Sequence, residues 1–224
     1  MHPAFQFLLA TLVFMLLHVS AMALCSRAFG ITIRRIAYGV GPVLFSVGRA
    51  QIRLLPFAGS VVLKDTREEQ IYDDEPGGDI YNERPLWQQL AVLLSGVALP
   101  LILALGLLGA QGWHGFTGAF VQLIAGALAP LSTAQQLLAD GDAFARTHDF
   151  VLVAALVSVK LCALNLLPFG GLNGGQALLA IARGGKPYAA WEEMVAKWLL
   201  LPGLAVLLAW LVAFGLYCWK ATGA

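Results

Sequence analysis

Residues 165–176 of this chain read Asn-Leu-Leu-Pro-Phe-Gly-Gly-Leu-Asn-Gly-Gly-Gln. They begin at the end of residues 150–167, an apolar stretch in which Lys160 is the one charged residue. The residue before a proline disfavours the helical conformation, and two glycines follow soon after Pro168. We therefore expect a helix that ends near Pro168 and a chain that folds back on itself directly afterwards.

The composition around this stretch is that of a membrane protein. Of 224 residues, 59% are hydrophobic and 12% are charged, and the mean hydropathy is +0.76. A soluble domain carries about 25% charged residues. The formal net charge of +1 also lacks the basic excess of a nucleic-acid-binding protein. These numbers exclude an ordinary soluble globule, a disordered chain and a protein with nucleic acid among its partners.

Segments long enough to cross a bilayer recur along the chain, since a helix needs about 20 apolar residues to do so. Residues 1–224 are predicted to form one all-α polytopic membrane domain, with four transmembrane helices at residues 4–24, 86–108, 150–167 and 198–219. Residues 113–138 are also uncharged, but glycines and Pro130 interrupt them. That pattern favours an interfacial or re-entrant helix, with a fifth span as the alternative.

Charge placement predicts how these helices are oriented. Six basic residues lie between Arg27 and Lys64 with no acidic residue among them, and Arg183 and Lys186 lie between the third and fourth spans. Basic residues favour the cytoplasmic side. We therefore expect the first and third loops in the cytoplasm, and both termini outside it, in the inner membrane of a bacterium.

The first of these loops has two different parts. Residues 31–63 alternate short apolar stretches with glycines, which predicts a small β-element lying against the membrane or dipping into it. Residues 65–84 hold eight acidic residues and the Gly77-Gly78 pair. This second part is predicted to be a solvated, mobile loop.

The closing stretch at residues 165–176 resembles the N-L-L-P-x-x-x-L-D-G-G signature of the site-2 proteases, which are intramembrane zinc metalloproteases. Residues 16–22, Leu-Leu-His-Val-Ser-Ala-Met, lie where that family carries H-E-x-x-H. Further runs resemble the family in the same order along the chain: Tyr38 to Gly41, Leu55 to Val61, Leu94 to Gly96, and Ala129 to Ser132. The resemblance implies a three-helix protease core plus a fourth C-terminal span, without a PDZ domain.

The same resemblance implies which residues would form the site. In the family two histidines and an aspartate bind zinc, and the glutamate after the first histidine activates water. Here His18 keeps the first ligand, Val19 replaces the base, Met22 the second histidine, and Asn173 the aspartate. One imidazole, a thioether and a neutral amide do not suit zinc. We therefore predict no catalytic residue, no metal site and no cofactor, with His18 and Met22 facing Asn173.

The predicted function is that of a catalytically inactive homologue, a membrane scaffold that binds a membrane protein partner or a transmembrane substrate helix within the lipid bilayer. One alternative is an active intramembrane zinc metalloprotease with an atypical site. Another is a channel or transporter subunit, which a row of polar residues through the spans would favour, and the residues that offer such a row are His18, Ser20, Ser158, Lys160 and Asn165.

Two intramembrane residues need an account of their own, because polar groups in a span usually have partners. His18 is expected to hydrogen-bond Ser20, Asn173 or a backbone carbonyl, with a copper(I) site shared with Met15, Met22 and Cys25 as the alternative. Lys160 is a candidate partner-binding residue. Its ammonium is expected to meet either an acid of another subunit, or backbone carbonyls and the two asparagines within the chain.

Overall fold

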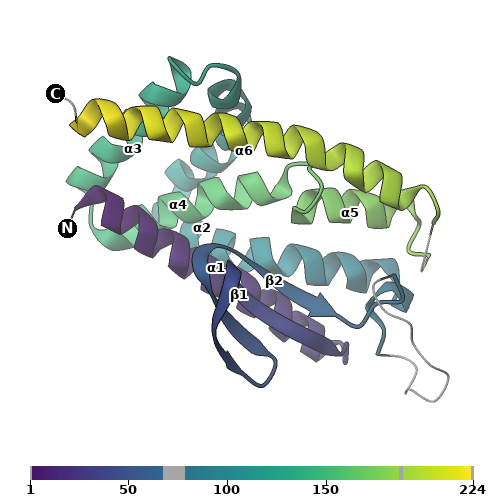
Figure 1. The fold of residues 1–224 in the computed structure, drawn as a ribbon. Helices are drawn as coiled ribbons and strands as arrows, with labels where there is room; N and C mark the ends of the chain where they lie inside the picture. The colour runs from purple at the N-terminus through teal and green to yellow at the C-terminus, as the bar shows by residue number, and fades with distance from the viewer. Residues whose placement is uncertain (1, 68–78, 187–188, 223–224) are drawn as a thin grey trace.

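The computed structural model describes residues 2–67, 79–186 and 189–222. Its first helix, α1 (Pro3–Ala28), is followed by strands β1 (Ile33–Val47) and β2 (Ala50–Leu63), and the remainder is helical (Figure 1). The architecture is a helical bundle with one small sheet packed beside α1. This agrees with the predicted fold class in its main features.

Three helices are long and apolar enough to cross a membrane: α1, α2 (Leu86–Leu128) and α6 (Glu192–Thr222). A fourth apolar helix, α4 (Phe150–Leu166), has 17 residues. That length is at the lower limit of about 17–25 residues for a spanning helix. Three candidate spans are therefore found, and a crossing by α4 stays a prediction.

Helix α2 contains the predicted segment at residues 86–108 and most of the one at residues 113–138, and a kink at Gly109 (φ 58°) separates two helical parts where the prediction placed the break. The second part ends at Leu128, short of the predicted end, and its position relative to the membrane stays a prediction. Pro130 then lies in the turn that leads to α3 (Thr133–Thr147). Glycine tolerates a positive φ without steric cost, so the chain can bend at Gly109 and resume a helix.

The sheet is a doubled hairpin. Val61 and Ser60 of β2 pair with Ile36 and Ala37 of β1 in one part of the sheet. Residues 50–52 lie between two segments of β1, beside residues 36–38 and beside residues 45–47. Gly39 (φ 98°) lies in the bend of β1, where a Cβ atom would come within 2.7 Å of the Leu55 carbonyl. The β-element predicted at residues 31–63 is thus present, and it packs on α1.

The predicted solvated loop at residues 65–84 needs correction at both ends, while residues 68–78 lie outside the described part. Asp65 is buried, and Tyr81 and Asn82 are buried in a 3-10 helix, η1 (Tyr81–Glu83). Asp79 accepts hydrogen bonds from Thr32 (2.7 Å) and Lys64 (3.0 Å). Burial acts to raise the pKa of Asp79, but these two bonds and the Lys64 charge outweigh it and hold the pKa below its usual value.

A buried ion cluster joins four distant parts of the chain at this end of the molecule. Arg67 pairs with Asp65 (2.6 Å) and with Glu192 at the start of α6 (2.6 Å). Arg183, at the end of α5 (Asn173–Ala182), pairs with Glu192 and donates to Gln89 of α2 (2.9 Å). Because the opposite charges are equal in number, the cluster is neutral as a whole, which is the condition under which charges are buried.

The apolar core lies between α1, α2 and α4, and it is built from small and aromatic side chains such as Phe14, Phe116 and Val159. Helix α6 crosses the outside of this core (yellow in Figure 1). It is held there by backbone and side-chain contacts. Gly170 N–H donates to the Leu199 carbonyl (2.9 Å), and Trp210 Nε1 donates to the Leu123 carbonyl (2.9 Å).

Candidate functional site

His18 is buried on α1 and points at α2. Its Nδ1 lies 2.8 Å from the Gly96 carbonyl oxygen, so this nitrogen carries the proton and donates it. In a regular helix that carbonyl would accept from the residue four positions later. That residue is Pro100, which has no N–H. His18 therefore satisfies an acceptor that the proline leaves free, which is the backbone-carbonyl alternative among the expectations for this residue.

The orientation of His18 has a second consequence. Histidines that bind metals commonly donate one ring N–H to a carbonyl, which fixes the ring and leaves the other nitrogen for the metal. With Nδ1 bound to Gly96, Nε2 of His18 is the free nitrogen. The position that the resemblance assigns to the first zinc ligand is thus occupied by a side chain oriented as a ligand would be.

Val19, at the position of the catalytic base, is fully buried. It packs against Gly59 of β2, where a Cβ atom would overlap the valine side chain and lie 2.9 Å from the Ala37 carbonyl. Strand β2 therefore passes directly against α1 at this point. The position offers no group that can accept a proton, and apolar contacts surround it.

Met22 and Asn173 are in contact although 151 residues separate them in the sequence. The Asn173 amide nitrogen lies 3.7 Å from the Met22 sulfur and donates to the Leu93 carbonyl of α2 at 2.5 Å. A Cβ atom at Gly96 would lie within 3.0 Å of both the Met22 and the His18 side chains. His18, Met22 and Asn173 thus converge on one turn of α2, as the sequence motifs predict.

This turn of α2 is the centre of the site, and the sequence interpretation had not assigned it a role. Three elements each donate a hydrogen bond to its carbonyl oxygens: α1 through His18, α5 through Asn173, and α4 through Cys162, whose sulfur lies 3.4 Å from the Val97 carbonyl. The spacing of Gly96 and Pro100 was the one signal that could have indicated a free acceptor.

The turn that positions Asn173 forms as its sequence dictates. Helix α4 ends at Leu166, and Leu167 before the proline is extended (φ −61°, ψ 146°). Helix α5 then begins at Asn173. The two glycines that follow Asn173 let α5 approach the end of α4 closely, because a Cβ atom at Gly174 would overlap the Leu166 carbonyl.

The sulfur ligands proposed for copper(I) do not converge with His18 in the structure. Met15 faces Gly59 in the sheet, with its Cγ atom 3.4 Å from the Cβ position of that glycine. Cys25 packs against another cluster, formed around Ile31 and Tyr81. Only Met22 of the three lies beside His18.

Lys160 finds its partners within the chain. Its ammonium donates to Gln122 Oε1 (2.6 Å) and to the Gly115 carbonyl (3.1 Å), both in the second half of α2. The Gly115 carbonyl is an acceptor of the predicted backbone kind, while Gln122 takes the place of the predicted asparagines. Asn165 donates to the Leu161 carbonyl (2.9 Å) instead. Within the described residues Lys160 forms no ion pair. A role in docking a partner stays a prediction.

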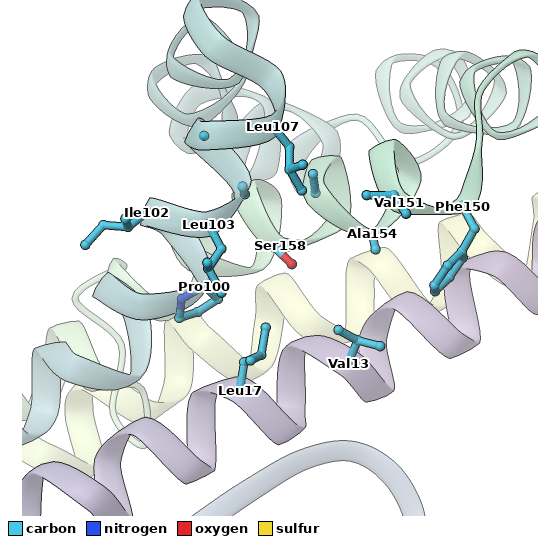
Figure 2. Close-up of a pocket in the computed structure, with 13 residues that line it drawn as sticks. Val13, Leu17, Pro100, Ile102, Leu103, Leu107, Phe150, Val151, Ala154 and Ser158 are labelled. Carbon is cyan, nitrogen blue, oxygen red and sulfur yellow. The ribbon is translucent and has the colours of Figure 1, made fainter.

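An apolar cavity of about 550 Å³ lies between α1, α2 and α4 (Figure 2). Val13 and Leu17 of α1 face Leu103 and Pro100 of α2 across it, and Ser158 of α4 points its hydroxyl oxygen into the space. Leu103 and several neighbours on α2 are exposed on the outer surface of the bundle. An apolar segment approaching through the bilayer could therefore reach this cavity.

The donor groups of the described residues do not form a metal site. Nowhere in residues 2–67, 79–186 and 189–222 do three His, Cys, Asp or Glu side chains gather closely enough to hold an ion. Comparison with known families matches the model of peptidase family M50, the site-2 protease family, to residues 6–209. No curated protein matches the chain.

Proposed function

The chain belongs to peptidase family M50, and on this basis we propose that it is a member without proteolytic activity that binds a transmembrane helix of a partner protein. The match covers residues 6–209, a range that includes both motif regions.

The observation that carries the proposal is the chemistry of the four site positions. A catalytic zinc takes about three nitrogen, oxygen or sulfur ligands and a water activated by a base. His18 alone is a good ligand, since Met22 presents a thioether and Asn173 a neutral amide nitrogen turned toward Leu93. Val19 is apolar and enclosed. These residues do not fit a catalytic zinc, and we derive no hydrolytic step from them.

We expect the purified protein to contain no stoichiometric zinc and to cleave no membrane substrate. The reason is that two of three ligands and the base are missing. Metal content measured on protein purified without chelator, together with proteolysis of candidate transmembrane substrates, tests this directly. One equivalent of zinc that His18→Ala removes, or cleavage that His18→Ala abolishes, would instead establish the active-protease alternative.

The cavity in Figure 2 supports the second half of the proposal. Its walls are apolar apart from the hydroxyl of Ser158, for which the described residues provide no hydrogen-bond partner. Transmembrane helices associate through close packing and interhelical hydrogen bonds from residues such as serine. A partner helix would fill the cavity and accept or donate a hydrogen bond at Ser158, which a lipid chain does not do along its length.

A photocrosslinking residue placed at Ala154, which lines the cavity, is expected to capture a discrete membrane protein in native membranes. The same residue at Val212, exposed on α6, is the matched control and is expected to capture none. Equal labelling at both positions would mean that the cavity holds only lipid. If Lys160→Met abolishes the capture while the protein stays folded, the lysine contributes to the docking as the sequence suggested.

A further inference from the structure

A second groove lies on the other side of α1, between this helix and the doubled hairpin. Its volume is about 480 Å³. Its walls include Leu12 and Leu16 of α1, and Phe45, Val47 and Ile52 of the hairpin. Among the described residues that line it, Arg53 is the only charged one. A cation in an otherwise apolar groove needs an explanation.

Arg53 lies beside the apolar surface of α1. The Tyr38 hydroxyl lies 3.1 Å from Ser20 Oγ, and Ser20 precedes the end of α1 by eight residues, about 12 Å of helix. Gly39, the next residue, lies against Arg53, since a Cβ atom there would be 3.0 Å from the Arg53 carbonyl. The arginine backbone therefore lies beside α1 and not beyond its end, and a cation held against apolar side chains is costly unless an anion pairs with it.

The protein itself satisfies Arg53 only in part. Its Nη2 donates to Gln51 Oε1 at 3.2 Å, while the part of the chain that the structure describes offers its buried Nε no hydrogen-bond partner. No carboxylate pairs with it among the described residues. The surrounding sequence adds positive charge, because residues 27–64 hold six basic residues and no acidic one. Both the local and the regional charge therefore favour an anion.

We propose that this groove binds a phospholipid, with the lipid phosphate held by the guanidinium of Arg53 and one acyl chain lying against α1. The planar guanidinium matches the oxygens of a phosphate and binds them with two parallel hydrogen bonds. The apolar walls accept the chain below the headgroup. The positive field of the hairpin favours a lipid of net negative charge, such as phosphatidylglycerol. The proposal is independent of proteolytic activity.

Native mass spectrometry of delipidated protein in detergent, titrated with phosphatidylglycerol, tests the proposal. The wild-type chain is expected to retain one molecule, and Arg53→Gln to bind about tenfold more weakly, the loss expected for one charge-assisted contact. Arg49→Gln is the matched control. It removes the same charge from the exposed turn of the same hairpin, outside the groove, and is expected to bind as the wild type does.

Diacylglycerol has the acyl chains but no phosphate, so it distinguishes binding through Arg53 from binding through the apolar walls. It is expected to be retained poorly. Thermal unfolding without lipid should be the same for both variants and the wild type. Equal weakening in Arg49→Gln and Arg53→Gln would show a general attraction by the basic hairpin, and would overturn the proposal. Retention of diacylglycerol as well as phosphatidylglycerol, or of neither lipid, would overturn it too.

Discussion

A chain carrying both Met22→His and Asn173→Asp is expected to bind one zinc ion, whereas the natural sequence is expected to bind none. His18 is already held by the Gly96 carbonyl with its other nitrogen free. Met22 and Asn173 touch each other, and the Met22 side chain flanks the same glycine as His18. The two replacement side chains would thus join His18 around one point, and three such ligands with an open position are what zinc requires.

The measurement is zinc stoichiometry after purification, compared with the two single variants. Each single variant has only two good ligands, so we expect the full equivalent in the double variant alone. His18→Ala added to the double variant should remove the metal. Proteolysis is not expected to return, because Val19 still occupies the position of the base. A folded double variant without zinc would show that the three positions are further apart than their contacts indicate.

The meeting of His18, Met22 and Asn173 could be predicted from the sequence because each element that brings them together is specified by residues close to one another in the chain. Helix length followed from apolar runs, and the β-element followed from glycine spacing. The end of α4 followed from the restriction that Pro168 places on Leu167. Once the two motifs were aligned with the family, the meeting of His18 and Asn173 across the bundle followed from the fold.

Features that depend on pairs of distant residues could not be predicted in the same manner. Arg67 and Glu192 are 125 residues apart, and nothing in either neighbourhood indicates the other. A backbone carbonyl was among the acceptors predicted for Lys160, and the Gly115 carbonyl is one. Gln122 was not predicted, because it lies 38 residues away in the part of α2 beyond Gly109. Bends made by a single glycine and ion pairs across the bundle require the three-dimensional structure.

The largest loss of stability is expected from Gly174→Ala, a substitution that adds one methyl group at the start of α5. A Cβ atom at Gly174 would overlap the Leu166 carbonyl and lie 2.6 Å from the Leu167 carbonyl. Both obstacles are backbone atoms at the end of α4, so no side chain can rotate away. Overpacking of this kind costs about 3 kcal/mol. Helix α5 would have to move, and Asn173 at its start would lose its hydrogen bond to the Leu93 carbonyl.

Gly215→Ala is the matched control for this prediction. Gly215 lies in α6, and nothing is found within 4 Å of the position that its Cβ atom would take. Alanine is the better helix former, so this variant is expected to be as stable as the wild type or more so, by about 0.5–1 kcal/mol. Unfolding in mild detergent, followed by circular dichroism, compares the two. If Gly174→Ala unfolded like Gly215→Ala, α5 could not be packed against the end of α4, and Asn173 would lie away from the turn of α2 on which the site is built.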